Sequence, residues 1–121
     1  MEVGKYNTLQ VLRATSVGLY LGDAEGNDVL LPHKYIPENI EMGQDIEVFI
    51  YRDSEDRLIA TTLTPAILRD QFAILEVVAT SSIGAFLDWG LEKDLFVPFK
   101  EQNHKLQNGQ WVPVYLYLDE E

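Results

Sequence analysis

Short segments of alternating apolar and polar residues run along this chain, and clusters of turn-forming residues separate them. The clearest segment spans residues 45–52, where Ile46, Val48 and Ile50 share one face of an extended strand. Phe49 and Tyr51 share the opposite face. Because side chains alternate between the two faces of a strand, this period of two predicts a half-buried β-strand with an aliphatic inner face.

The same pattern predicts four further strands in the first half of the chain, at residues 6–15, 18–21, 28–31 and 57–63. Residues 22–27 and 53–56 are rich in turn-forming residues. Pro32 and Pro37 oppose a strand between them, and we expect residues 37–39 to form one helical turn. Five short strands in about 60 residues predict a small closed barrel, since closure removes exposed strand edges.

The second half of the chain repeats the first. At an offset of 66 residues, residues 6–55 match residues 72–121 without a gap, and 14 of the 50 positions are identical. Matched pairs include Gly18 with Gly84 and Tyr20 with Phe86. The repeat predicts two tandem all-β domains, at residues 1–64 and 71–121, joined by a short apolar linker at residues 65–70.

The second copy ends before its fifth strand, because Glu121 matches Glu55. An open barrel leaves unpaired backbone groups along its edge strands. Two explanations fit this pattern. Either the chain is a fragment of something longer, which we favour, or another chain supplies the missing strand by exchange in a dimer.

Composition and charge narrow the function classes. The chain is 46% hydrophobic and has no cysteine, which predicts packed cores without disulfides and fits a cytoplasmic protein. It has no apolar run of membrane-helix length and no secretion signal, so we expect no membrane association. The formal net charge of −11 works against phosphate binding. Any RNA binding is therefore expected to be weak or local, or to depend on stacking more than on charge.

Alternation places one aromatic ring at the same outward position in both copies. Leu19 and Leu21 suit the barrel interior, which turns Tyr20 outward, and Phe86 occupies the equivalent position. Such a ring stacks on a base of single-stranded nucleic acid. The alternative is that it covers the other domain or a missing one. A second outward set is expected to pack between the domains: Phe49, Tyr51, Tyr115 and Tyr117.

Charged residues near the turns give weaker signals. Asp53 and Arg57 flank the last hairpin turn, where Arg57 either contacts a phosphate or forms a surface ion pair. Lys34 and Lys100 occupy equivalent positions just after the third strand of each copy, which suggests a shared phosphate contact.

These residues resemble the S1 RNA-binding domain. On strand two, the shared pattern has a glycine followed two residues later by an aromatic residue, and strand three is apolar. Gly-Gln precedes strand four, and the last hairpin has an Asp followed four residues later by an Arg. The stretches at residues 4–9, 53–62 and 84–99 are similar to the conserved virulence factor B family of bacterial proteins. The resemblance covers nearly the whole chain.

The resemblance implies two tandem OB-fold (S1-like) five-stranded barrels, the second lacking its last strand. It implies the N-terminal part of a protein with further S1 domains and a winged helix, which binds single-stranded RNA and regulates gene expression. Carried over to this sequence, the binding face comprises Tyr20, Phe86, Asp53, Arg57 and Asp119. Val17 and Ile83 replace its first aromatic, and its strand-three histidine falls on Leu31 and Val97.

Little in the sequence points to catalysis. His33 and His104 lack the spacing and partners of a metal site, and no glycine-rich phosphate loop is present. We therefore expect no enzyme activity, no metal and no cofactor. The alternative to RNA binding is a protein-interaction or scaffold module, because barrels of this type serve many roles.

Overall fold

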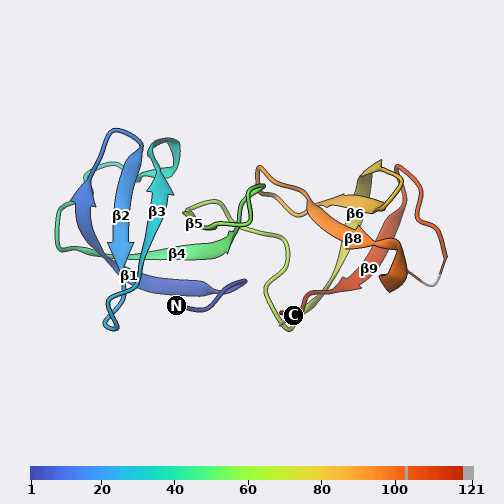
Figure 1. Cartoon of the computed structure of the whole chain (residues 1–121), viewed down its shortest axis with the longest axis horizontal. Coiled ribbons are helices and arrows are strands. Elements are labelled where there is room, and N and C mark those ends of the chain that lie inside the picture. Colours follow the sequence, from blue (N-terminus) through green and yellow to red (C-terminus); the bar gives the residue numbers. More distant parts are fainter. Residues whose placement is uncertain (103, 119–121) are drawn as a thin grey trace. The chain divides into compact units, whose positions relative to one another are not determined.

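The computed structural model describes residues 1–102 and 104–118, and these residues form an all-β protein. Their contacts divide the chain into two compact units, Met1–Leu63 and Thr64–Glu121, shown from blue to green and from green to red in Figure 1. Within the described part of the chain, no helix has the length and apolar character needed to cross a membrane.

The first unit is a closed five-stranded barrel, as the alternation predicted. Its strands pair in the order β1-β2-β3-β5-β4, and β4 returns to β1. All pairs are antiparallel except β3 with β5. The strand bounds lie close to those predicted: β1 (Tyr6–Ala14), β2 (Gly18–Gly22), β3 (Asp28–Pro32), β4 (Asp45–Arg52) and β5 (Leu58–Thr61).

Aliphatic side chains from all five strands fill the barrel interior. Each is at most 9% exposed, because inward positions recur at every second residue of a strand. Met1, Tyr35, Ile36 and Ile40 are partly buried and pack against this core. The core consists of Leu9, Val11, Leu19, Leu21, Val29, Leu31, Ile46, Val48, Ile50 and Ala60.

One local expectation for the first unit is wrong. The helical turn is a 3-10 turn, η1 (His33–Tyr35), directly after β3, and residues 37–39 do not form one. On the outer face of β4, Phe49 is 0% exposed and Tyr51 is 6% exposed, and their packing between the domains stays a prediction. Phe49 contacts the rings of Tyr6 and Tyr51, so this face carries a small aromatic cluster of its own.

The second unit is an open, four-stranded sheet with the order β8-β7-β6-β9. Its strands are β6 (Phe72–Thr80), β7 (Gly84–Asp88), β8 (Leu95–Pro98) and β9 (Trp111–Tyr115), followed in Figure 1 from yellow to red. A second 3-10 turn, η2 (Phe99–Glu101), follows β8 as η1 follows β3. The described residues of this unit contain no fifth strand, as the repeat predicted.

The segment after β5 is hydrogen-bonded to the second unit. The N–H of Ala66 donates to the carbonyl of Trp89 over 2.8 Å, and the N–H of Asp70 donates to the carbonyl of Leu116 over 2.6 Å. Ile67, between them, is 1% exposed. We therefore describe residues 64–70 with the second unit, while the boundaries assigned from the sequence stay a prediction.

The strand-two glycine sets how closely β2 and β3 approach. Gly18 has φ +152°, and a Cβ placed on it would lie 2.1 Å from the carbonyl oxygen of Leu31. No side chain fits there, because real contacts of a Cβ with an oxygen are more than 3 Å long. Glycine at this position therefore fixes the register of β2 against β3.

We expect Gly18→Ala to destabilise the first unit by more than the ~1–2 kcal/mol that a positive φ alone costs a residue with a side chain. The matched control is Gly43→Ala, since Gly43 also has a positive φ but open space around its Cβ position. Urea denaturation followed by circular dichroism measures both variants. Equal losses of stability would contradict the role of the Leu31 carbonyl.

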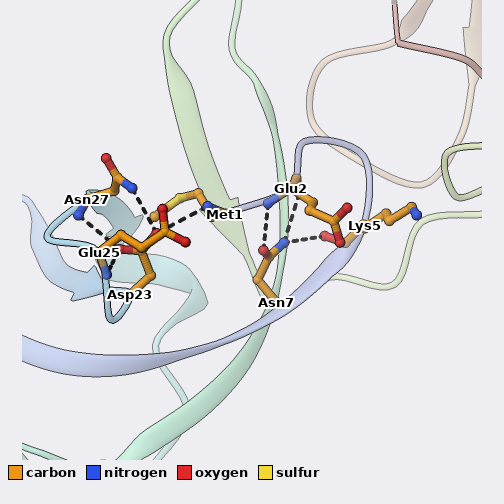
Figure 2. Close-up of polar contacts among 7 residues, drawn as sticks. All are labelled: Met1, Glu2, Lys5, Asn7, Asp23, Glu25 and Asn27. Carbon is orange, nitrogen blue, oxygen red and sulfur yellow. Dashed lines mark hydrogen bonds and ion pairs between the residues drawn. The ribbon is translucent and has the colours of Figure 1, made fainter.

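Asp23 organises the turn between β2 and β3. Its carboxylate accepts hydrogen bonds from the Asn27 side chain and from the backbone N–H groups of Glu25 and Asn27. The Met1 ammonium group also donates to it over 3.1 Å, as Figure 2 shows. These donors, led by the Asn27 side chain, hold the pKa of Asp23 far below its ordinary value.

Asp23→Asn should therefore lower the melting temperature at neutral pH and flatten its fall in acid. The pKa of Asp23 is lower in the folded chain than its ordinary value of 3.8. Its contribution to stability is thus complete above that value and is lost as the pH falls toward the folded pKa. The two melting temperatures should converge below about pH 4. A difference that stays constant with pH would rule out this role.

Candidate nucleic-acid interface

The two aromatic rings singled out in the sequence lie opposite the buried aliphatic interior. Tyr20 on β2 is half-buried between two fully buried leucines. Phe86 on β7 is half-buried between Ala85 and Leu87, which are both 0% exposed. Neither ring is sealed inside its unit, so each presents part of its surface outside the core.

Each unit has an outward face on its second and third strands, opposite the core. Phe96 on β8 is a ring of this face that the sequence pattern did not single out. It is the direct cross-strand neighbour of Phe86, with ring centroids 5.1 Å apart, and it is 36% exposed. The corresponding neighbour of Tyr20 is Leu30, which is half-buried. Alternation along β8 could have revealed Phe96, because it lies between Leu95 and Val97.

The strand-three histidine position that the resemblance assigns to the first unit falls on an inward residue. Leu31 is 0% exposed and belongs to the barrel core. The residue of β3 beside Tyr20 is Leu30, and the residue of β8 beside Phe86 is Phe96. Position 30 and position 96 are therefore the strand-three members of this face.

Gly84 makes room for the ring of Phe96. A Cβ on Gly84 would lie 2.6 Å from a ring carbon of Phe96 and 2.5 Å from the carbonyl oxygen of Val97. The strand-two glycine of the second unit thus brings β7 and β8 close together, as Gly18 does for β2 and β3. It also lets the Phe96 ring lie over the glycine backbone beside Phe86.

A β-bulge in β1 brings a cation to the first of these faces. The register with β2 shifts between Val11 and Arg13, so that Arg13 pairs with Tyr20. The Arg13 guanidinium lies over the Tyr20 ring, 4.4 Å from its centroid. The same guanidinium forms an ion pair with Asp28 over 3.0 Å. Tyr20 is therefore covered by an arginine of its own unit.

Asp53 and Arg57 contact each other across the hairpin turn between β4 and β5. Asp53 accepts hydrogen bonds from the backbone N–H groups of Glu55 and Arg57 and from the Arg57 side chain. The Arg57 N–H is the main reason that the pKa of Asp53 is lowered. The Arg57 guanidinium also contacts Glu55 over 2.7 Å. The surface ion pair considered from the sequence is present.

Arg13 and Arg57 are typical of the arginines in this chain. Arg52 lies within 3.8 Å of Asp56, and Arg69 within 3.7 Å of Asp70. All four arginines of the sequence thus have a carboxylate of the chain within 4 Å. Such pairs occupy cations that a phosphate would otherwise attract.

Lys34 and Lys100 lie in the equivalent turns η1 and η2, and both are exposed. Each turn is tied to the start of the adjacent strand two: the N–H of His33 donates to the Val17 carbonyl, and that of Phe99 to the Ile83 carbonyl. The Lys34 ammonium lies 5.3 Å from the centroid of the Tyr35 ring.

Asp119 lies outside the described residues. Among the residues that are described, no cluster of three His, Asp or Glu side chains is arranged to hold a metal ion.

The strand order of the first unit and the closed barrel define an OB-fold, whose face on strands two and three is the usual place for a ligand. The second unit repeats this arrangement with four strands. The S1 domain family model matches residues 3–63 and again residues 71–121. The chain therefore belongs to the S1 domain family, in two tandem copies.

Curated relatives confirm the resemblance to conserved virulence factor B. The chain is 28% identical to that protein of Staphylococcus haemolyticus over 98% of its own length, and 27% identical to that of Staphylococcus aureus over the same share. It is 39% identical to protein YitL of Bacillus subtilis over 80% of its length. The chain spans only 42% of the Staphylococcus proteins and 33% of YitL.

A solved structure shares the fold. It is a multidomain protein with nucleic acid binding domains from Streptococcus pneumoniae, with a TM-score of 0.81. The match covers 98% of this chain and 42% of that one, at 19% sequence identity. Similarity at this level of identity supports the all-β architecture of the two units.

Proposed function

We propose that this chain is a single-stranded RNA-binding module in which outward aromatic rings stack on bases. The observation that carries the proposal is the position of Tyr20 and of the Phe86–Phe96 pair on strands two and three of their units. In OB-folds this face binds oligonucleotides. Membership of the S1 domain family and the nucleic acid binding domains of the pneumococcal neighbour support the same assignment.

We further propose that the module acts in the cytoplasm within a longer bacterial protein that regulates gene expression after transcription. The Staphylococcus relatives are more than twice as long as the matched region, which leaves room for the additional S1 and winged-helix domains that the resemblance implies. Binding by these two units alone is expected to be weak, because stacking must act against a net charge of −11.

Replacing both Tyr20 and Phe86 with alanine should weaken RNA binding by at least about fivefold, since one stacked base is worth ~1–3 kcal/mol. Fluorescence anisotropy with labelled single-stranded homopolymer RNAs measures the affinity. The matched control is Phe72→Ala, which removes a ring that is 78% exposed on β6, a strand outside the face. Unchanged affinity in the double variant would contradict the proposal.

The affinity should depend only shallowly on salt. Each phosphate neutralised by a lysine or arginine on a single strand contributes a slope of about −0.7 to the plot of log affinity against log salt. All four arginines already contact carboxylates of the chain, so we expect a slope no steeper than about −2. A slope typical of many phosphate contacts would show that charge, not stacking, drives binding.

A protein-interaction module is the second candidate, and a specific observation favours it. Phe72, Tyr115 and Tyr117 of the second unit are each at least 45% exposed, and their rings lie in contact. Exposed aromatic patches of this kind mark protein contacts. Absence of RNA binding, in the same anisotropy titration, would leave this function as the conclusion.

A further inference from the structure

The two units carry the same strand-two ring in different surroundings, and the difference begins in their first strands. Both first strands contain a β-bulge at the matching place, between Val11 and Arg13 in β1 and between Val77 and Ala79 in β6. Strict alternation from Leu9 and Val11 would turn position 13 into the core. The bulge turns it outward instead, beside the strand-two ring.

The residue at this position differs between the units. In the first unit it is Arg13, which pairs with Tyr20, covers its ring and is 53% exposed at its side chain. In the second unit it is Ala79, which pairs with Phe86 and whose methyl group covers little of a ring. Among the described residues, cations lie over the rings of Tyr20, Tyr35 and Phe99, and not over Phe86.

Asp28 holds the arginine in place. Its carboxylate lies 3.0 Å from the Arg13 guanidinium, which is thereby fixed between an anion and the ring. The guanidinium gains from both partners at once, since a cation over an aromatic face and an exposed ion pair are each modestly favourable. A base that stacks on this face of Tyr20 must first displace the arginine and break both contacts.

The third strands also make the ring of the second unit more accessible to a base than the ring of the first. Beside Phe86, the second unit has Phe96, whose ring is 36% exposed and lies 5.1 Å from that of Phe86. Beside Tyr20, the first unit has Leu30, which is half-buried and offers no ring. The second unit thus has two adjacent rings, and the first has one ring under a guanidinium.

We infer that Arg13 closes the stacking face of the first unit, so that the Phe86–Phe96 pair of the second unit is where single-stranded nucleic acid bases stack. This inference rests on the proposed function and refines it: Arg13 is a specificity-determining residue that lowers the affinity of its own unit. The first unit then serves as a closed copy of the same module.

Substitution of Arg13 tests the inference. Electrostatic attraction of RNA by Arg13 and blocking of the Tyr20 ring by Arg13 predict opposite changes in affinity. Arg13→Ala removes a cation, so an electrostatic contribution would weaken RNA binding. If the arginine blocks the ring, Arg13→Ala instead strengthens binding by the first unit. In a Phe86→Ala background, where the open site is removed, we expect it to raise affinity for a labelled homopolymer RNA by about threefold to fivefold.

The converse variant is Ala79→Arg, which recreates the covered ring in the second unit. Asp94 occupies the position that matches Asp28, the anionic partner of Arg13 in the first unit. We expect Ala79→Arg to weaken RNA binding severalfold although it adds a positive charge. Matched controls are Ile74→Arg, which adds the same charge at an exposed position of β6, and Arg52→Ala, which removes one from β4.

The single ring variants complete the test. Phe86→Ala and Phe96→Ala should each weaken binding by about fivefold or more, while Tyr20→Ala should change it by less than about twofold. Equal losses for Tyr20→Ala and Phe86→Ala, or weaker binding on Arg13→Ala in the Phe86→Ala background, would overturn the inference while RNA binding itself stands. Absence of binding by the unaltered chain and by Arg13→Ala alike would overturn the proposed function, and this inference with it.

Discussion

The rest of the structure depends on one constraint: along the second strand of each unit, side chains alternate between the core and the outer face. Leu19 and Leu21 must both lie in the barrel core, and only one face of the strand then remains for Tyr20. A slip of one residue would bury the ring and expose the leucines, which no closed barrel tolerates. Gly18 fixes the register further, since the carbonyl of Leu31 occupies the space of a side chain.

Periodicity and the internal repeat were sufficient for the fold and for the position of its first rings. The strands of the first barrel and the outward direction of Tyr20 and Phe86 follow from alternation, and the open second sheet follows from the repeat. These features depend on the hydrophobicity of each residue, which can be read from the sequence without knowing its partners. The identity of Phe96 as a third ring was also within reach, because it alternates with Leu95 and Val97 in β8.

Features that depend on partners far apart in the sequence could not be predicted. Alternation from Leu9 and Val11 assigns Arg13 to the core, and only the shifted register of β1 against β2 places it over Tyr20. Phe49 is similar: its outward parity is correct for the strand, but contacts with Tyr6 and Tyr51 help to bury it completely. A one-dimensional pattern contains the direction of a side chain and not what covers it.

The distribution of charge is the reason that the proposed function assigns RNA binding to stacking rather than to phosphate contacts. With 20 acidic and 9 basic residues, the chain has too few cations to leave its arginines unpaired. Arg57 illustrates the result, since two carboxylates of its own turn contact its guanidinium. A flat aromatic ring needs no counter-charge, because it binds through dispersion and the exclusion of water. For the proposed RNA binding, an acidic chain with Phe86 and Phe96 side by side is therefore suited to contacts with bases more than with the backbone, and its selectivity would follow from which rings are open.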